Sequence, residues 1–246
     1  MAHYSAFRNY RLNRLLSNTC IGAAVGVYGA WNYSNRGVIY DFLRQQQNFL
    51  KSVVPTLPSE PNPKRIHDTL KKYFLLKAND SSNYVSWIGS ALSHQDLYHI
   101  LFNLVTWSSF APTLYMLPTH HFATLIFGSA IASSATWLYD QRQRKREASP
   151  WRDTTNASAL GSSGIVSGLL ATVTMFAPTA RVAVLGIIPA PLWVSFGAYI
   201  LVDTYMMQTA TESRIGHSAH VGGAAFGILY YTLFLRRFGG ILGRRY

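Results

Sequence analysis

Charged side chains are scarce in this chain of 246 residues. Aspartate, glutamate, lysine and arginine make up 13% of it, whereas ordinary soluble domains contain about 25%. Cysteine is nearly absent too, because Cys20 is the only one, and this excludes a disulfide-bonded scaffold. Acidic residues are the minority among the charges: 10 Asp and Glu against 22 Lys and Arg give a formal net charge of +12.

A chain with so few charges and 14% aromatic residues can bury enough apolar surface to fold, so disorder is excluded. Two classes remain for a basic chain of this kind. One is a nucleic-acid binder, whose lysines and arginines gather on one folded face. The other is a membrane protein, whose charges lie in loops and tails.

The basic residues favour the second class, because they gather in blocks at residues 1–18, 36–80, 140–153 and 236–246. Six stretches between or beside these blocks are apolar enough to cross a bilayer: residues 19–33, 97–117, 122–139, 163–177, 182–207 and 217–235. A soluble bundle of unusually apolar helices is the alternative, but residues 182–207 contain no charge before Asp203. The pattern predicts an all-α polytopic membrane protein with six transmembrane helices. The lipid bilayer is its expected partner, and nucleic acid is not.

The expected organisation is one six-span domain, residues 19–235, between basic tails at residues 1–18 and 236–246. The first loop, residues 34–96, is long and is broken by four prolines between positions 55 and 63. Residues 38–54 have the spacing of an amphipathic helix, which would lie on the membrane surface or pack on the rest of the protein. The acid-free N-terminal tail fits a mitochondrial targeting segment or an ordinary basic flank.

A serine flanked by glycines opens the fourth apolar stretch, in the tetrapeptide Gly161-Ser162-Ser163-Gly164. A serine at a helix start has an exposed hydroxyl and free backbone N–H groups around it. Those N–H groups could stabilise an oxyanion. Since the chain has 18 glycines, close helix packing is the alternative interpretation of this motif.

A histidine, His220, opens the last apolar stretch and could accept a serine proton as a general base. Two glycine pairs have the GxxxG spacing that lets helix backbones approach closely: Gly164 with Gly168, and Gly223 with Gly227. If the fourth and sixth helices pack through these pairs, Ser163 and His220 meet at one depth. The alternative is a histidine that merely hydrogen-bonds a neighbouring helix.

A third motif lies at the start of the second apolar stretch, where His94 is followed by His99 and Asn103. The last two are four residues apart and share one helix face. Both can donate hydrogen bonds and neither is negatively charged, which suits a site where a carbonyl oxygen becomes negative. The alternatives are polar contacts between helices and a metal site with His94, His99 and His220 as ligands. The metal site is the weakest interpretation, since Asp96 is the only carboxylate near these histidines.

Asp203 is the one acidic residue well inside an expected span. A hydrogen bond that helps to pack its helix, to a tyrosine or a backbone group, is the favoured interpretation. The sharper hypothesis is that Asp203 orients His220 from the neighbouring helix.

The three motifs, in this order on the second, fourth and sixth of six spans, resemble those of the rhomboid family of intramembrane serine proteases. The similarity covers about residues 73–235. It implies that Ser163 is the nucleophile and His220 the base of a dyad without an essential acid, and no metal or cofactor is expected. It also implies that His99, Asn103 and the Ser163 backbone N–H stabilise the oxyanion. Supporting roles are expected for His94, Asp203, Gly161 and Gly164, with His94 more structural than catalytic.

Four segments resemble the mitochondrial branch, the presenilins-associated rhomboid-like proteases: residues 160–164, 187–189, 203–204 and 217–224. This resemblance implies an integral protein of the mitochondrial inner membrane, with another intracellular membrane as the alternative. The implied substrates are transmembrane proteins. The basic termini predict that both ends of the chain lie in the matrix or cytosol and that the active site faces the opposite side.

Two positions depart from the family pattern. Many bacterial rhomboids have a Trp-Arg pair in the first loop, whereas Trp87 is followed here by Ile88. They also have an aromatic residue four positions after the nucleophile, which packs on the histidine, and this chain has Ser167 there. Two other functions therefore remain alternatives: an inactive rhomboid-like scaffold that binds membrane helices, and a component of a transporter or channel.

Overall fold

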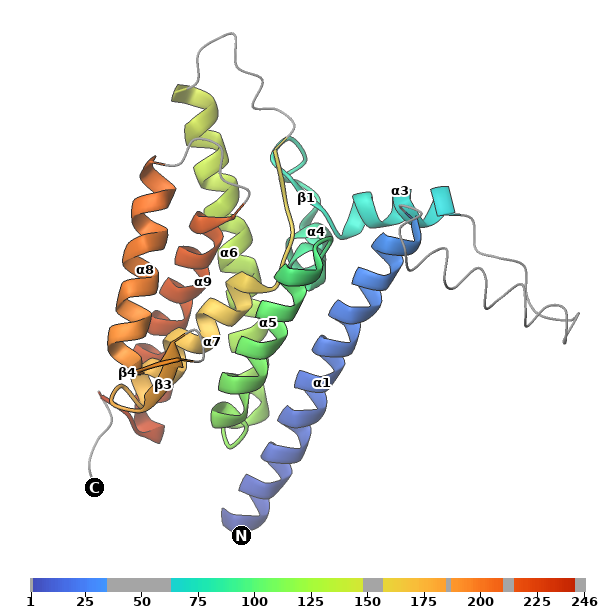
Figure 1. Ribbon diagram of the computed structural model, residues 1–246. Coiled ribbons are helices and arrows are strands. Elements are labelled where there is room, and N and C mark those ends of the chain that lie inside the picture. The colour runs from blue at the N-terminus through green and yellow to red at the C-terminus, as the bar shows by residue number, and fades with distance from the viewer. Residues whose placement is uncertain (1, 35–62, 148–156, 185–186, 210–214, 242–246) are drawn as a thin grey trace, which may run out of the picture.

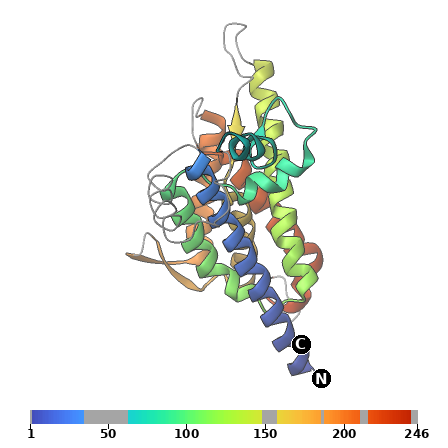
Figure 2. The same cartoon turned by 90° about the vertical axis from the view of Figure 1, so that its right-hand side faces the viewer.

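The computed structural model describes residues 2–34, 63–147, 157–184, 187–209 and 215–241 (Figure 1). Six helices dominate it: α1 (Ala2–Ser34), α5 (Leu97–Phe110), α6 (Thr119–Glu147), α7 (Ser163–Phe176), α8 (Leu192–Thr209) and α9 (His217–Tyr230). α1 and α8 lie at opposite edges of the bundle, with α7 and α9 between them (Figure 1). Turned by 90°, α1, α5 and α6 run side by side (Figure 2). The prediction of a mostly helical protein is confirmed.

The centre of the bundle is α9, which contacts α6, α7 and α8. Its glycines meet those of α7. A Cβ atom on Gly223 would lie 2.0 Å from the carbonyl oxygen of Gly164, and one on Gly227 would lie 2.3 Å from that of Gly168. Only glycine allows two backbones to come this close. The packing of α7 on α9 through the two GxxxG pairs, which the sequence offered as a condition for Ser163 and His220 to meet, is thus present.

Large apolar side chains fill the core beside this contact, and each is at most 1% exposed. They are Leu114, Phe122, Leu125, Ile126, Ile165, Leu169, Tyr231 and Leu235. These residues belong to α6, α7, the 3₁₀ turn η2 (Ala111–Leu114) and the π-helical turn η3 (Tyr231–Leu235) that continues α9. The core therefore packs α7, which carries Ser163, against α6 and against the end of α9.

The N-terminal helix α1 is continuous from Ala2 to Ser34, so the expected boundary between a tail at residues 1–18 and a span at 19–33 lies inside it. Two polar side chains of this region are fully buried. The Asn13 amide donates to the carbonyl oxygens of Tyr115 and Leu117, at 3.0 and 2.7 Å. Ser17 Oγ accepts hydrogen bonds from Trp107 Nε1 and the Tyr115 hydroxyl, at 2.7 and 2.9 Å. Residues 13 and 17 are thus part of the packed domain.

The expected span at residues 182–207 is wrong in its first third. There β3 (Arg181–Val184) pairs antiparallel with β4 (Ile188–Pro191), and α8 begins only at Leu192. Pro189 and Pro191 explain the difference, since a proline inside a helix removes a hydrogen bond and clashes with the preceding turn. Pro112 similarly explains why α5 ends at Phe110, within the expected span 97–117, and gives way to η2.

The described part of the first loop, residues 63–96, is more ordered than predicted. It contains α3 (Pro63–Tyr73), α4 (Tyr84–Gly89) and the 3₁₀ turn η1 (Ser90–Leu92). It also contains β1 (Leu76–Lys77), which pairs antiparallel with β2 (Ser158–Ala159). This ribbon joins the first loop to the segment that enters α7. The expected amphipathic helix at residues 38–54 lies outside the described residues.

Length and composition identify two helical segments that could cross a membrane, Thr119–Glu147 and His217–Phe238, while α7 is apolar but shorter. This result covers the described residues only. The number of six transmembrane helices therefore stays a prediction. The all-α fold class needs a small correction, because two short antiparallel strand pairs, β1–β2 and β3–β4, are also present.

Candidate active site

The turn before Ser163 depends on Gly161. Its φ of 135° lies in the region that favours glycine, and its N–H donates to the Ser90 carbonyl oxygen at 2.9 Å. A Cβ atom here would lie 2.4 Å from Cε1 of His99. Gly161 is thus required both for the backbone turn and for the close approach of the His99 ring. Ser163, half-buried, is the first residue of α7 after this turn.

His94 joins this turn to α5. Its Nε2 accepts hydrogen bonds from the Asn103 amide at 2.9 Å and from the Ser162 backbone N–H at 3.2 Å. His94 precedes α5 and is only 1% exposed. Burial, and to a smaller extent the charge on His99, lower the pKa of His94 to about 4. The ring is therefore neutral at neutral pH and can accept both bonds.

His99 lies in the first turn of α5, over Gly161. The Asp96 carboxylate caps this helix and accepts the His99 backbone N–H at 2.8 Å. The imidazole packs edge-on against that of His94, with ring centroids 5.1 Å apart. The structure therefore brings the predicted His94, His99 and Asn103 together beside the turn that precedes Ser163.

His220 lies in the first turn of α9, and Asp203 of α8 holds its ring. His220 Nδ1 is 2.9 Å from Asp203 Oδ2. A carboxylate only accepts hydrogen bonds, so Nδ1 carries the proton and Nε2 of the neutral ring is an acceptor. Asp203 is buried and also bonds to His217 Nδ1 through its Oδ1, at 2.5 Å. The contact that the sharper hypothesis for Asp203 requires is therefore formed.

An aromatic ring does pack on His220, and it comes from α8. The centroids of the Tyr199 and His220 rings are 5.9 Å apart, with the planes inclined by 35°. The Tyr199 hydroxyl lies 2.6 Å from Ser167 Oγ, which itself donates to the Ser163 carbonyl oxygen at 2.8 Å. The same hydroxyl also bonds to the Asp203 carboxylate, so Tyr199 links Ser167 to Asp203. This pair of side chains occupies the place of the aromatic residue expected at position 167.

The ends of α7 and α9 that carry Ser163 and His220 lie against each other. Gly164 follows Ser163, and Ala219 precedes His220. A Cβ atom on Gly164 would lie 3.4 Å from the Ala219 carbonyl oxygen and 2.4 Å from the side chain of Ser133 on α6. The close packing of Gly164 thus brings the first turns of the two helices together.

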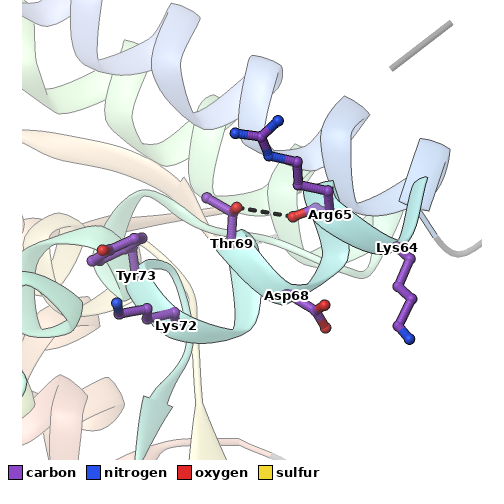
Figure 3. A pocket seen from close by; sticks show the side chains of 6 residues that line it. All are labelled: Lys64, Arg65, Asp68, Thr69, Lys72 and Tyr73. Atoms are coloured by element: carbon purple, nitrogen blue, oxygen red, sulfur yellow. Dashed lines mark hydrogen bonds between the residues drawn. The ribbon is translucent and has the colours of Figure 1, made fainter. Parts of the chain in front are cut away.

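A hollow of about 430 Å³ lies elsewhere, on the exposed side of α3 (Figure 3). Its lining residues are Lys64, Arg65, Asp68, Thr69, Lys72 and Tyr73. None of them is a predicted site residue, and all belong to a single helix. The dashed bond in Figure 3, from Thr69 Oγ1 to the Arg65 carbonyl oxygen, is internal to this helix. This hollow is separate from the group around Ser163.

Two side chains of the site, His217 and Tyr199, were missed as site residues. Spacing could have found both, since His217 is three residues before His220 on α9 and Tyr199 is four before Asp203 on α8. Among the described residues, Asp203, His217 and His220 form a group that could hold a metal ion. One possible ligand atom of each, a ring nitrogen or a carboxylate oxygen, lies within 4.8 Å of the other two. This group differs from the metal site that the sequence offered as an alternative, whose ligands were His94, His99 and His220.

The sequence model of the rhomboid domain matches residues 81–237, which include all of these side chains. The chain belongs to the rhomboid family. It is 33% identical over 165 residues to Rhomboid protein 1, mitochondrial, of Saccharomyces cerevisiae, covering 65% of this chain and 45% of that protein. It is 26% identical over 168 residues to Presenilin-associated rhomboid-like protein A, mitochondrial, of Danio rerio, covering 65% and 40%.

The chain thus spans less than half the length of these two relatives. Both relatives are mitochondrial, and the predicted resemblance to the mitochondrial branch is confirmed. This rhomboid protein is accordingly an integral mitochondrial membrane protein.

Proposed function

We propose that this rhomboid protein is a serine endopeptidase that cleaves transmembrane substrates with Ser163 and His220. One observation carries the proposal. The Nδ1 of His220 is bonded to a buried carboxylate, which leaves Nε2 as an acceptor on a helix packed against the start of α7. A serine at a helix start beside a histidine of this tautomer is the arrangement of an activated nucleophile.

In the proposed reaction, Ser163 Oγ attacks the carbonyl carbon of the scissile peptide bond, and His220 Nε2 accepts the hydroxyl proton. The resulting imidazolium then donates this proton to the leaving amine as the C–N bond breaks. A water molecule, activated by the same ring, hydrolyses the acyl-enzyme and restores the serine. Asp203 stabilises the imidazolium in both steps.

The oxyanion of the tetrahedral intermediate would be held from α5 and α7. His99, one N–H of the Asn103 amide and the Ser163 backbone N–H are the proposed donors. The Asn103 amide has two N–H groups, so the bond to His94 leaves the other for the oxyanion. His94 itself serves to hold this amide and the Ser162 backbone, and Gly161 keeps the His99 ring against the turn.

The proposed membrane arrangement uses α1, α5, α6, α7, α8 and α9 as six spans in the mitochondrial inner membrane. α7 has 14 residues, and at 1.5 Å per residue it is about 21 Å long, against a bilayer core of about 30 Å. Ser163 at its start would therefore lie below the membrane surface, on the side away from the termini. Substrates are proposed to be transmembrane proteins whose cleaved bond lies at this depth.

A fluorophosphonate probe tests the proposed activity, because it reacts with an activated serine hydroxyl. We expect covalent labelling of the purified protein in bilayers, complete loss of it in Ser163→Ala, and cleavage of transmembrane reporter peptides by the unchanged protein only. Thermal unfolding would show whether the variant is folded. Binding of reporter helices without labelling or cleavage would identify a scaffold, and ion or solute flux without labelling would identify a transporter or channel component.

A further inference from the structure

The carboxylate that holds His220 has a second histidine partner. His217 Nδ1 lies 2.5 Å from Asp203 Oδ1, while His220 Nδ1 lies 2.9 Å from Oδ2. Asp203 and His217 are buried, with 4% and 8% of their surfaces exposed. Each oxygen of the carboxylate thus has its own imidazole.

Both imidazoles come from one helix. His217 and His220 are three residues apart in the first turn of α9, so their side chains leave this helix on the same face. Asp203 meets them from α8. Since a carboxylate accepts hydrogen bonds and never donates them, both histidines must present Nδ1–H to it.

The second bond restricts the carboxylate. Without the His217 bond, the carboxylate of Asp203 would keep the Tyr199 hydroxyl and His220 as partners, and Oδ1 would lose its imidazole. The bond from His217 holds Oδ1, and because the carboxylate is planar, Oδ2 is then held toward His220. His217 therefore contributes, through Asp203, to the orientation of the His220 ring, beside the Tyr199 ring that packs on it.

We propose that His217 is a positioning residue, which fixes the Asp203 carboxylate and thereby keeps His220 as the Nδ1–H tautomer with Nε2 available to Ser163. The proposal rests on the proposed function, because it assigns His220 the part of general base. His217 acts through Asp203 and is not a catalytic residue.

Two substitutions separate the hydrogen bond from the side-chain volume. His217→Asn keeps an N–H donor near the position of Nδ1, and His217→Leu removes it. We expect kcat for a transmembrane reporter peptide to fall roughly 10- to 100-fold in His217→Leu, as for misplacement of a catalytic group by about 1 Å, with KM nearly unchanged. His217→Asn should keep most of kcat. His217→Phe is a second variant without a donor, and His120→Leu, at the start of α6, is a matched control.

A direct measurement of the tautomer completes the test. In protein with ¹⁵N-labelled histidines in bilayers, the nitrogen resonances of His220, identified by their loss in His220→Gln, report which nitrogen carries the proton. We expect the Nδ1–H form in the unchanged protein and in His217→Asn, and a mixture of tautomers in His217→Leu and His217→Phe.

Unchanged kcat and an unmixed Nδ1–H tautomer in folded His217→Leu or His217→Phe would overturn the proposal, as would failure of His217→Asn to restore what these variants lose. If the unchanged protein neither cleaves peptide nor reacts with the fluorophosphonate, the proposed function fails instead. The nitrogen spectra still decide the positioning role in that case, because they do not depend on turnover.

Discussion

The imidazole of His220 is held by two residues of α8, Asp203 through its carboxylate and Tyr199 through its ring. The carboxylate selects the tautomer, and the aromatic ring limits the tilt of the imidazole. Tyr199 is in turn anchored to Ser167, whose hydroxyl bonds to the backbone of Ser163 itself. Ser163 and His220 are thus connected through a chain of hydrogen bonds and ring contacts that runs from α7 to α8 to α9.

Removal of the carboxylate should lower turnover while leaving the protein folded. In Asp203→Asn, one of the two histidines faces an amide N–H₂ group and loses its acceptor, so His220 is no longer held in a single tautomer. Loss of the corresponding carboxylate costs about 10⁴-fold in a serine protease triad, and we take this as the upper limit of the expected fall in kcat. Peptide cleavage and thermal unfolding, measured on the same preparation, check the prediction. Turnover equal to that of the unchanged protein would reject a role for Asp203.

The two parts of Tyr199 can be separated by substitution. An aromatic contact of this kind is worth about 0.5–1.5 kcal/mol, so Tyr199→Leu should lower kcat roughly 2- to 10-fold. Tyr199→Phe keeps the ring and loses the hydroxyl with its bonds to Ser167 and Asp203, and its kcat should fall less. Steady-state cleavage of a reporter peptide by both variants measures the difference. Equal losses in the two variants would show that the hydroxyl, rather than the ring, matters.

At the scale of elements, the contact between α7 and α9 determines where the two first turns lie. Ser163 and His220 belong to different helices, and their separation depends on how closely these helices approach. The backbones meet at two glycine pairs, and the contact of Gly164 with Gly223 lies directly beside Ser163. The geometry of the site is therefore sensitive to the volume of one side chain at position 223.

Gly223→Ala should separate the helices. Its Cβ would lie 2.0 Å from the Gly164 carbonyl oxygen, and that atom belongs to the backbone and cannot move aside alone. Overpacking of this kind costs about 1–3 kcal/mol, so we expect a lower unfolding temperature together with lower kcat. Gly197→Ala on α8 is the matched control, because its Cβ meets no described atom within 4 Å. An effect of equal size in both variants would contradict the argument.

The elements also show what can be predicted from sequence. The glycine pairs and the histidine motifs follow rules of local spacing, so the contact of α7 with α9 and the grouping of His94, His99 and Asn103 were predictable. The pairing of β3 with β4 was missed because the residues around Pro189 and Pro191 are apolar and were assigned to a transmembrane helix, although prolines disfavour one. The spacing of Tyr199, four residues before Asp203 on α8, places both side chains on one face, but its contact with the His220 ring depends on how α8 packs against α9. The ordered first loop was missed because β1 pairs with residues about 80 positions away.

At the scale of the whole molecule, one buried neutral histidine makes the fold sensitive to acid. The pKa of His94 is lowered from 6.5 to about 4 by burial first and by the charge on His99 second. The unfolded chain therefore binds one more proton than the folded protein between these two values. By linkage, the stability that His94 contributes is present above about pH 6.5 and is lost as the pH falls toward 4.

We accordingly expect the unfolding temperature in detergent to fall steadily from pH 6.5 to pH 4. His94→Gln removes the titrating ring and should flatten this part of the profile, although the variant starts from a lower stability. Differential scanning fluorimetry across the pH range measures both proteins. An equally steep profile for His94→Gln would assign the acid sensitivity to other groups.

The bonds of α1 have a consequence for maturation of the chain. Ser17 binds Trp107 near the C-terminal end of α5, and Asn13 binds the backbone that follows η2. The Trp31 indole donates to Ser93, just before the N-terminal end of α5, at 2.6 Å. α1 thus fastens α5, which carries His99 and Asn103, at both ends. An import peptidase that removed residues 1–18 as a targeting segment would remove the bonds of Asn13 and Ser17 and keep the bond of Trp31. The end of α5 next to His99 would keep its bond from Trp31, and only the opposite end would be loosened.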